Sequence, residues 1–180
     1  MGKQFDAFET AHTDFIAQQH MFFVGTAAPE GKVNISPKGM DSLRVLAPNR
    51  VIWLNVTGSG NETAGHLLAV PRMTLMWCSF TTRPMILRAY GTARTIYTRD
   101  AEWTGLAEQL PTLPGARQIY DMTVEMVQTS CGYAVPFMEY REDRATLRKW
   151  AEDRGDDGIA TYWETRNQTT LDGAPTGLIE

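Results

Sequence analysis

The stretch NVTGSGNETAGHLLAVPRMTLMW, Asn55 to Trp77, places a polar, glycine-containing loop between two apolar runs. The residues just before the loop, 51–56 (VIWLNV), are typical of a buried strand, and Glu62–Ala69 is predicted as a short helix. Gly58 and Gly60 allow backbone N–H groups to converge on a ligand, and the following helix presents the positive end of its dipole. The loop therefore has the properties of an anion-binding site.

Two interpretations of this loop remain open. Ser59, Asn61 and Thr63 can donate hydrogen bonds to a phosphate at the helix N-terminus. Alternatively, Asn61 or Ser59 only caps the helix, which both residue types commonly do. The loop is neither a P-loop, because no GK[ST] follows, nor a GxGxxG dinucleotide fingerprint.

The chain on both sides of this stretch predicts a mainly β domain. Strands are expected over 21–28 and 33–39, and over 43–56, which is divided by a turn at Pro48 and Asn49. Strands over 72–80 and 85–97 complete six strands within the first hundred residues. This spacing indicates a barrel or sandwich rather than alternating βαβ units.

Helices are expected around this β region, which gives an α+β class. An amphipathic helix is predicted over 5–18, and another over 99–110 with Thr98 as its N-cap. A further strand is predicted over 120–130 and a charged helix over 141–155, with Gly155 beyond its end. The polar tail, 165–180, is expected to lie partly extended over a neighbour. With no repeat or linker, residues 1–180 are predicted to form a single domain.

Composition excludes several classes of function. The 180 residues are 43% hydrophobic and 21% charged, as in ordinary globular proteins. A net charge of -4 argues against nucleic acid or an anionic membrane as the main partner. Two cysteines give no disulfide framework, and no apolar run approaches the ~20 residues of a membrane span. We expect a soluble, cytoplasmic protein.

Two basic residues outside the loop are candidate ligands for an anion. Lys38 ends a predicted strand after Ser36 and Pro37, where it either points toward the same anion or is a solvated turn residue. Arg88 lies within the apolar run MILRAYG and requires a partner or ligand unless it is on a solvated face.

The sequence contains little catalytic machinery of its own. The three histidines, His12, His20 and His66, lack metal-ligand spacing, and no nucleophile elbow, HExxH motif or carboxylate pair is present. Cys131 is interpreted as a structural thiol because no adjacent basic residue lowers its pKa. A phosphate-binding loop without acid–base groups fits a cofactor that carries its own chemistry.

Several segments together resemble the pyridoxamine 5'-phosphate oxidase-related family of FMN-binding split barrels. They are HMFFVGTA (20–27), NISPKG (34–39), VIWLNVTGSGNETAGHLL (51–68), PRMTLMWCSF (71–80) and ILRAYGTA (86–93). The later segments TSCGYAVPFMEY (129–140) and RNQTTLDGAPTG (166–177) resemble a subgroup of that family whose reactions are poorly defined.

The resemblance implies a six-stranded split barrel that forms a homodimer, with two FMN molecules in clefts between the subunits. We expect the apolar strands 72–80 and 85–97 at the centre of the dimer. The positions matching cofactor-contacting residues of the family are Ser36 and Lys38 at the ribityl phosphate, Asn55 and Thr57 beside the ring, Ser59, Gly60, Asn61 and Thr63 at the helix opening near the phosphate, and Arg88 from the other subunit. Where the oxidase uses a basic pair at the helix opening, this chain has neutral donors, so Lys38 is the expected charge.

The expected function is that of an FMN-dependent oxidoreductase that transfers hydride to or from a small planar substrate, with NADH or NADPH as an electron donor. The C-terminal sequence DGAPTGLIE lacks the arginine-containing segment that grips pyridoxamine phosphate, which argues against vitamin B6 oxidation. The alternatives are a flavin-binding storage or sensor module, an FMN-free structural dimer, and a split barrel that uses the deazaflavin F420 or haem.

Overall fold

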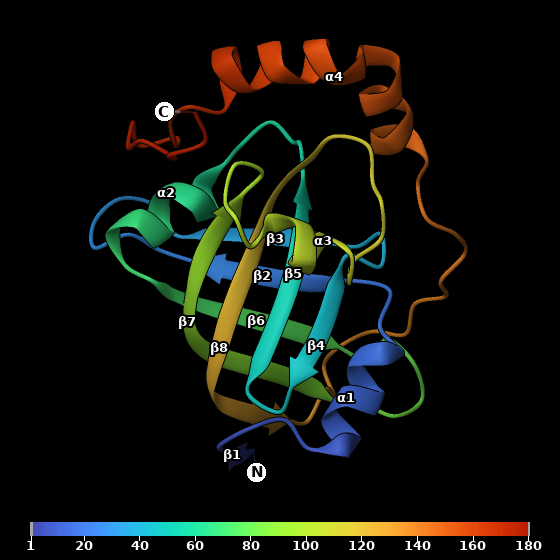
Figure 1. Cartoon of the computed structure of the whole chain (residues 1–180). Coiled ribbons are helices and arrows are strands. Elements are labelled where there is room, and N and C mark those ends of the chain that lie inside the picture. The colour runs from blue at the N-terminus through green and yellow to red at the C-terminus, as the bar shows by residue number, and fades with distance from the viewer. Residues whose placement is uncertain (1, 180) are drawn as a thin grey trace.

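The computed structural model describes residues 2–179 and contains, within that range, one eight-stranded antiparallel sheet and four helices (Figure 1). The strands are β1 (Lys3–Phe5), β2 (Phe22–Thr26), β3 (Asn34–Lys38), β4 (Leu43–Ala47), β5 (Arg50–Val56), β6 (Arg72–Cys78), β7 (Ile86–Tyr97) and β8 (Ala116–Ser130). The helices are α1 (Thr10–Ala17), α2 (Glu62–Ala69), α3 (Trp103–Ala107) and α4 (Thr146–Arg166).

The sheet folds over on itself to make two layers. Its strand order is β3-β2-β6-β7-β8-β5-β4, and β1 pairs with the end of β8. Figure 1 shows β2, β3 and β6 crossing behind β4, β5 and β8, while the long strands β7 and β8 bend from one layer to the other. A register shift at Tyr90 and Gly91 lies within this pair. A Cβ at Gly91 would overlap the carbonyl oxygen of Thr123, so the close approach of the strands requires glycine there.

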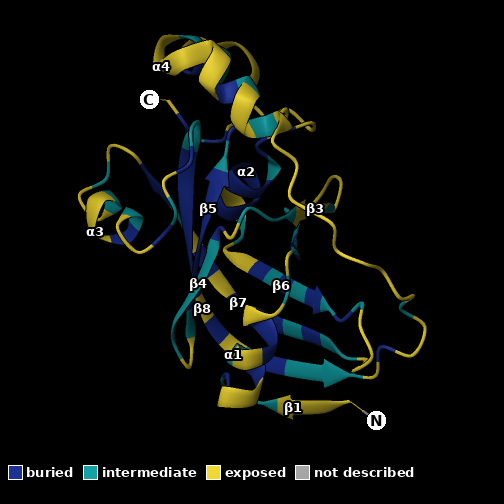
Figure 2. Ribbon diagram, turned by 90° about the vertical axis from the view of Figure 1, so that its right-hand side faces the viewer, coloured by how far each residue is buried: buried dark blue, intermediate teal, exposed yellow. Residues whose placement is uncertain are grey.

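Alternation along the strands sends apolar side chains to both faces of the sheet. Trp53, Leu75 and Trp77 are buried in the main core between the two layers. Ile52 and Ile119 lie in a second cluster under α3. Figure 2 shows buried residues concentrated in the strands and α2, whereas α4 is mostly exposed.

Most of the predicted elements are present. The strands expected within 21–97 correspond to β2–β7, and the predicted bounds of the helix after the opening loop match α2. The fold is mainly β with helices, as expected, but it has eight strands where the resemblance implied six. The extra strands are β1 and β8, of which β8 was predicted over 120–130 and begins four residues earlier.

The prediction of a helix over residues 5–18 is wrong at its start. Phe5 belongs to β1 and pairs with Val127, because the end of β8 offers it backbone partners. The helix begins at Thr10 after a capping box, in which His12 Nδ1 accepts a hydrogen bond from the backbone N–H of Glu9 (3.0 Å).

Two C-terminal helices also differ from their predictions. Thr98 does not cap a helix over 99–110, because Asp100 accepts a hydrogen bond from the Tyr97 N–H (2.8 Å) and closes a turn. The helix predicted over 141–155 starts at Thr146, and a second helical segment continues beyond Gly155, whose φ of 65° breaks α4 in two. No helix within residues 2–179 is long and apolar enough to cross a membrane.

The polar tail packs on its own chain. Thr170, Thr176 and Leu178 are buried, and Thr169 forms an isolated bridge with Pro175. Tyr97 Oη donates to the carbonyl oxygen of Thr176 (2.5 Å), so the tail is fixed against the end of β7. The Leu171 N–H also donates to Glu62 (3.0 Å), so the tail lies beside the start of α2.

Candidate functional site

A polar cavity of about 300 Å3 lies where the ends of β3 and β5, the start of α2 and the start of β8 meet. The strands β3 and β5 are far apart in the sheet order, and the folding of the sheet brings their ends together. β5 ends at Val56, and the flexible residues Gly58 and Gly60 follow it. Thr57, the first residue after the strand, is held by a hydrogen bond from its N–H to the Gly115 carbonyl oxygen (2.8 Å). The site is thus built at a strand-to-helix junction.

Seven of the nine residues expected at the cofactor line this one cavity. They are Ser36, Lys38, Asn55, Ser59, Gly60, Asn61 and Thr63. Thr57 lines the adjoining cleft instead. Arg88 lies on β7, donates to Ser130 Oγ (3.2 Å) and lines neither cavity in this chain. Its expected reach into the site of a second subunit stays a prediction.

Two cations lie at this cavity, and only Lys38 was foreseen. Arg117, at the start of β8, is 2% exposed and donates to Gln118 Oε1 (2.9 Å), Asn167 Oδ1 (2.6 Å) and the Gly60 carbonyl oxygen (3.0 Å). All three acceptors are neutral. Within residues 2–179, neither Lys38 nor Arg117 has a carboxylate within 4 Å. The cavity therefore carries two positive charges, neither of which forms an ion pair with a described residue.

Electrostatics of the cavity reflect this imbalance. Burial, and secondarily the charge of Arg117, lowers the pKa of Lys38 to about 8. Burial also lowers the pKa of Arg117, whose guanidinium nevertheless remains charged in proteins. The Lys38 ammonium lies 5.7 Å from the centre of the Trp53 ring. Because desolvation disfavours both charged forms, a bound anion would stabilise the protein at this point.

Tyr120 adds a buried hydrogen-bond donor to the cavity. Its side chain is fully buried, lines the cavity and stacks on Trp53 with ring centres 4.5 Å apart. Its hydroxyl group has no hydrogen-bond partner among the described residues. Burial raises the pKa of Tyr120, so the phenol stays protonated and able to donate.

The opening loop is held in place by the C-terminal segment. Asn167 is fully buried, and its Nδ2 donates to the carbonyl oxygens of Gly58 (3.1 Å) and Ser59 (3.5 Å). Together with the bond from Arg117 to Gly60, these contacts engage three carbonyl oxygens that would otherwise repel an anion. Trp163 Nε1 donates to Thr57 Oγ1 (2.8 Å) and ties α4 to the same loop.

The interpretation that Asn61 only caps α2 is wrong. Asn61 occupies the N-cap position, but its side chain makes no capping hydrogen bond. Its carboxamide instead accepts a hydrogen bond from Gln118 Nε2 (3.0 Å) and donates to the Asn167 carbonyl oxygen (3.4 Å). Among residues 2–179, no side chain accepts a hydrogen bond from the first-turn N–H groups of α2, which leaves the positive end of the helix available to a ligand.

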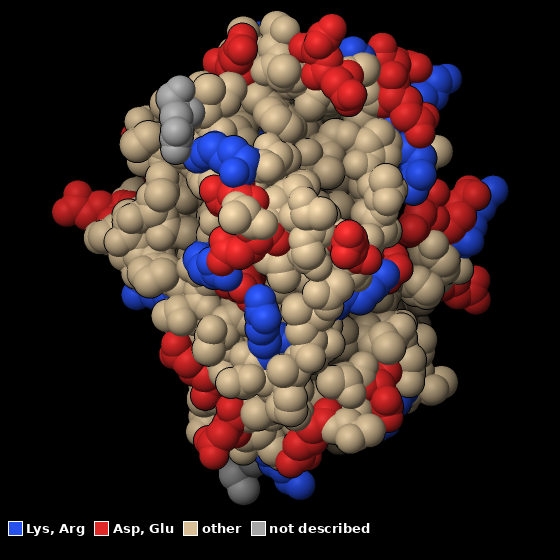
Figure 3. Space-filling view, in the orientation of Figure 1, with Lys and Arg blue, Asp and Glu red and all other residues tan. Residues whose placement is uncertain are grey.

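One carboxylate also lines the cavity, but it is engaged elsewhere. Both oxygens of Glu62 accept hydrogen bonds from the Leu171 N–H, each at 3.0 Å. Glu62 therefore fastens the tail to the start of α2 instead of neutralising Lys38 or Arg117. Acidic side chains elsewhere gather with basic ones along α4, as Figure 3 shows.

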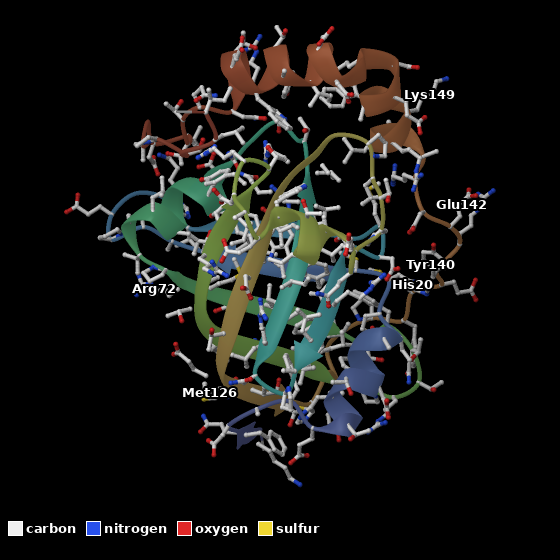
Figure 4. All side chains as sticks on the ribbon, viewed as in Figure 1. His20, Arg72, Met126, Tyr140, Glu142 and Lys149 are labelled. Atoms are coloured by element: carbon white, nitrogen blue, oxygen red, sulfur yellow. The ribbon has the colours of Figure 1, made fainter. Side chains whose placement is uncertain are left out.

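A second, larger cavity of about 790 Å3 adjoins the first and shares Lys38, Gly58 and Ser59 with it. We call it the aromatic cleft, because its walls include His20, Tyr140, Trp150 and Tyr162. The rings of His20 and Tyr140 stack with centres 3.6 Å apart, and Figure 4 shows them together below α4. A phosphorylated ligand in the polar cavity can extend toward this cleft.

Sequence reasoning missed Arg117, Tyr120 and Asn167. Tyr120 fell within a predicted strand, whose alternation with Met122 and Val124 places its side chain on the inner face. The same alternation places Arg117 on the opposite face, so its burial at the cavity could not be read from the pattern. Asn167 gave no signal either, because a polar residue in a turn-rich tail is ordinarily exposed.

Solved structures define the class of protein to which this fold belongs. HupZ of Group A Streptococcus aligns with a TM-score of 0.55 at 20% identity, covering 68% of this chain and 98% of its own. A candidate pyridoxamine 5'-phosphate oxidase from Lactobacillus delbrueckii aligns with a TM-score of 0.55 at 19% identity, covering 68% of this chain and 94% of its own. The chain thus has the fold of pyridoxamine 5'-phosphate oxidase-like proteins.

Sequence comparison identifies the family. The family model described as pyridoxamine 5'-phosphate oxidase matches residues 8–131. The pyridoxamine 5'-phosphate oxidase family protein ustO of Aspergillus flavus is 35% identical over 182 residues, covering 90% of this chain and 72% of that protein. The chain belongs to the pyridoxamine 5'-phosphate oxidase family, as the resemblance predicted.

Proposed function

We propose that the polar cavity binds the phosphate group of FMN and that the protein is a flavin-dependent oxidoreductase. The observation that carries this proposal is the pair of cations, Lys38 and Arg117, without a carboxylate partner among the described residues. The unpartnered hydroxyl group of Tyr120 and the start of α2 add donors. A phosphate dianion supplies the negative charge and the acceptor oxygens that this set of groups favours.

The residues of this chain would bind and orient the cofactor. Lys38 and Arg117 supply charge, Tyr120 and the α2 N-terminus donate hydrogen bonds, and Asn167 holds the loop. When bound, the flavin itself supplies hydride-transfer chemistry. Neither histidine nor cysteine lines the polar cavity in the described part of the chain, which agrees with a site that binds a reactive cofactor.

A homodimer is part of this proposal. Ile35 on the edge strand β3 and Val33 directly before that strand are each 69% exposed. They border an apolar groove of about 520 Å3 that also includes Met73, Met76 and Tyr90. A second copy of the chain would cover these residues of β3, β6 and β7, and exposed apolar patches commonly mark such interfaces. Sedimentation at micromolar concentration that shows only a 20 kDa species would contradict the proposal.

The test of function begins with the absorption spectrum and the released chromophore of the purified protein. We expect FMN, and release of haem or F420 would contradict the cofactor assignment. Anaerobic NADH or NADPH should then bleach the bound flavin, and an acceptor should restore its colour. A yellow protein that neither donor reduces would be a storage or sensor module, the second candidate that the lack of acid–base groups supports.

A further inference from the structure

The aromatic cleft has a corner built by the break in α4. Gly155 adopts φ 65° and ψ 178°, so the helix turns there and its two halves converge, as the bend in Figure 1 shows. Trp150 precedes the break and Tyr162 follows it, and their rings meet edge-to-face with centres 5.2 Å apart. The Arg154 guanidinium lies 4.5 Å from the Trp150 ring centre and 5.4 Å from that of Tyr162. The corner thus presents two aromatic surfaces and a positioned cation.

The charges that line the cleft favour an anionic ligand. Three cations, Lys38, Arg144 and Arg154, line it, against the two carboxylates of Glu142 and Asp143. None of the three cations has a carboxylate within 4 Å in residues 2–179. A guanidinium that stacks on aromatic rings keeps the N–H groups at its edge free, and a carboxylate can accept two hydrogen bonds from them in a bidentate pair.

The size and apolar surface of the cleft favour a flat ring. Its volume of about 790 Å3 lies within the ~300–1,000 Å3 range of small-molecule sites. Met21, Met40 and Leu147 add apolar surface to that of the aromatic side chains. The far wall, from Tyr140 to Tyr162, lies outside the matched family region of 8–131, so the chain's own C-terminal segment determines what this cleft accepts.

We infer that the aromatic cleft binds a planar aromatic molecule carrying a carboxylate, with the ring against Trp150 and Tyr162 and the carboxylate at Arg154. If the protein is the flavin-dependent oxidoreductase proposed above, this molecule is its substrate. The shared residues Lys38, Gly58 and Ser59 place the cleft directly beside the polar cavity.

The experiment is a calorimetric titration of the FMN-loaded protein with 2-naphthoate. The matched probes are 2-naphthamide, which has the same ring without the charge, and cyclohexanecarboxylate, which has the charge without a flat ring. We expect 2-naphthoate to bind at least about ten-fold more tightly than either, because both the ring contacts and the charge-assisted hydrogen bonds contribute.

Variants assign the contributions to residues. Arg154→Met should weaken 2-naphthoate about ten-fold and leave 2-naphthamide unchanged, because it removes the cation and keeps an apolar stem. Trp150→Leu should weaken both naphthyl ligands. Arg148→Met is the control, since Arg148 is exposed on α4 and does not line the cleft, and it should change neither affinity.

Three results would overturn the inference: equal affinity for 2-naphthoate and 2-naphthamide, no effect of Arg154→Met, or, in the apoprotein, displacement of 2-naphthoate by FMN. The last would assign the cleft to the flavin ring, and the proposed FMN site would stand. Conversely, if the protein binds no FMN but the apoprotein binds 2-naphthoate in an Arg154-dependent way, the cleft assignment stands and the flavin proposal falls.

Discussion

Replacing Asn167 by aspartate tests whether the positive charge of Arg117 binds the phosphate. In the protein, Arg117 Nη1 donates to Asn167 Oδ1 at 2.6 Å. Asn167→Asp places a carboxylate at that contact, so an internal ion pair neutralises one of the two cations of the cavity. The loss of one charge-assisted interaction corresponds to about 1.5–3 kcal/mol, or a roughly ten- to hundred-fold weaker affinity for FMN.

The same substitution also affects folding stability. It replaces the Nδ2 that donates to the carbonyl oxygens of Gly58 (3.1 Å) and Ser59 (3.5 Å) with an oxygen that cannot donate, which costs about 1–3 kcal/mol per lost bond, and the new ion pair with Arg117 offsets part of this cost. Asn167→Ala has no such offset, because it leaves both Arg117 Nη1 and the Gly58 carbonyl oxygen without their partner. We therefore expect the alanine variant to be the less stable one and the aspartate variant to discriminate more strongly against FMN.

The assay is fluorescence titration of FMN and riboflavin against the wild type and Asn167→Asp, with chemical unfolding of each protein. Gln168→Glu is the control, since it adds the same charge at the next residue of the chain, whose side chain lines neither cavity. We expect the ratio of FMN to riboflavin affinity to fall ten-fold or more in Asn167→Asp only. If both ligands weaken equally, Asn167 is merely structural and the reasoning is refuted.

Two further predictions follow from the cavity and its surroundings. FMN affinity should be greatest between about pH 7 and 8, where the phosphate, with a second pKa near 6, is a dianion and Lys38, with a pKa of about 8, is still protonated. It should fall above pH 8 as Lys38 loses its proton, whereas riboflavin affinity, measured in the same buffers, should stay level; parallel curves would contradict the role of Lys38. Cys131 is exposed and lines neither cavity, so Cys131→Ser should leave flavin content and any turnover nearly unchanged, and loss of turnover with flavin retained would place this thiol in the site.

The strands and α2 could be predicted because each depends on the pattern of apolar, polar and glycine residues within its own short segment. Trp53 and its neighbours alternate within an apolar run, and the glycines after Val56 stop the strand wherever the rest of the chain lies. Phe5 could not be assigned in this way, because its helical spacing to Phe8 and His12 competes with a strand partner at Val127, more than a hundred residues away.

The site was predictable only in the part that the loop itself encodes. Lys38 and the residues from Ser59 to Thr63 are close in sequence to strand and helix ends, where ligands commonly bind. Arg117 and Asn167 become site residues only through tertiary contacts, since each is buried by a partner from a distant segment. Arg117 adds a second cation to the cavity beside Lys38, from a strand whose start was predicted four residues too late.

The central claim is that the cavity recognises a phosphate, and the most direct measurement compares FMN with riboflavin on wild type and Lys38→Ala. Lys149→Ala serves as the control because Lys149 is exposed on α4 and lines neither cavity (Figure 4). We predict that wild type binds FMN far more tightly than riboflavin, and that Lys38→Ala weakens FMN about ten- to hundred-fold while riboflavin affinity hardly changes. Equal affinity of wild type for FMN and riboflavin would contradict the account.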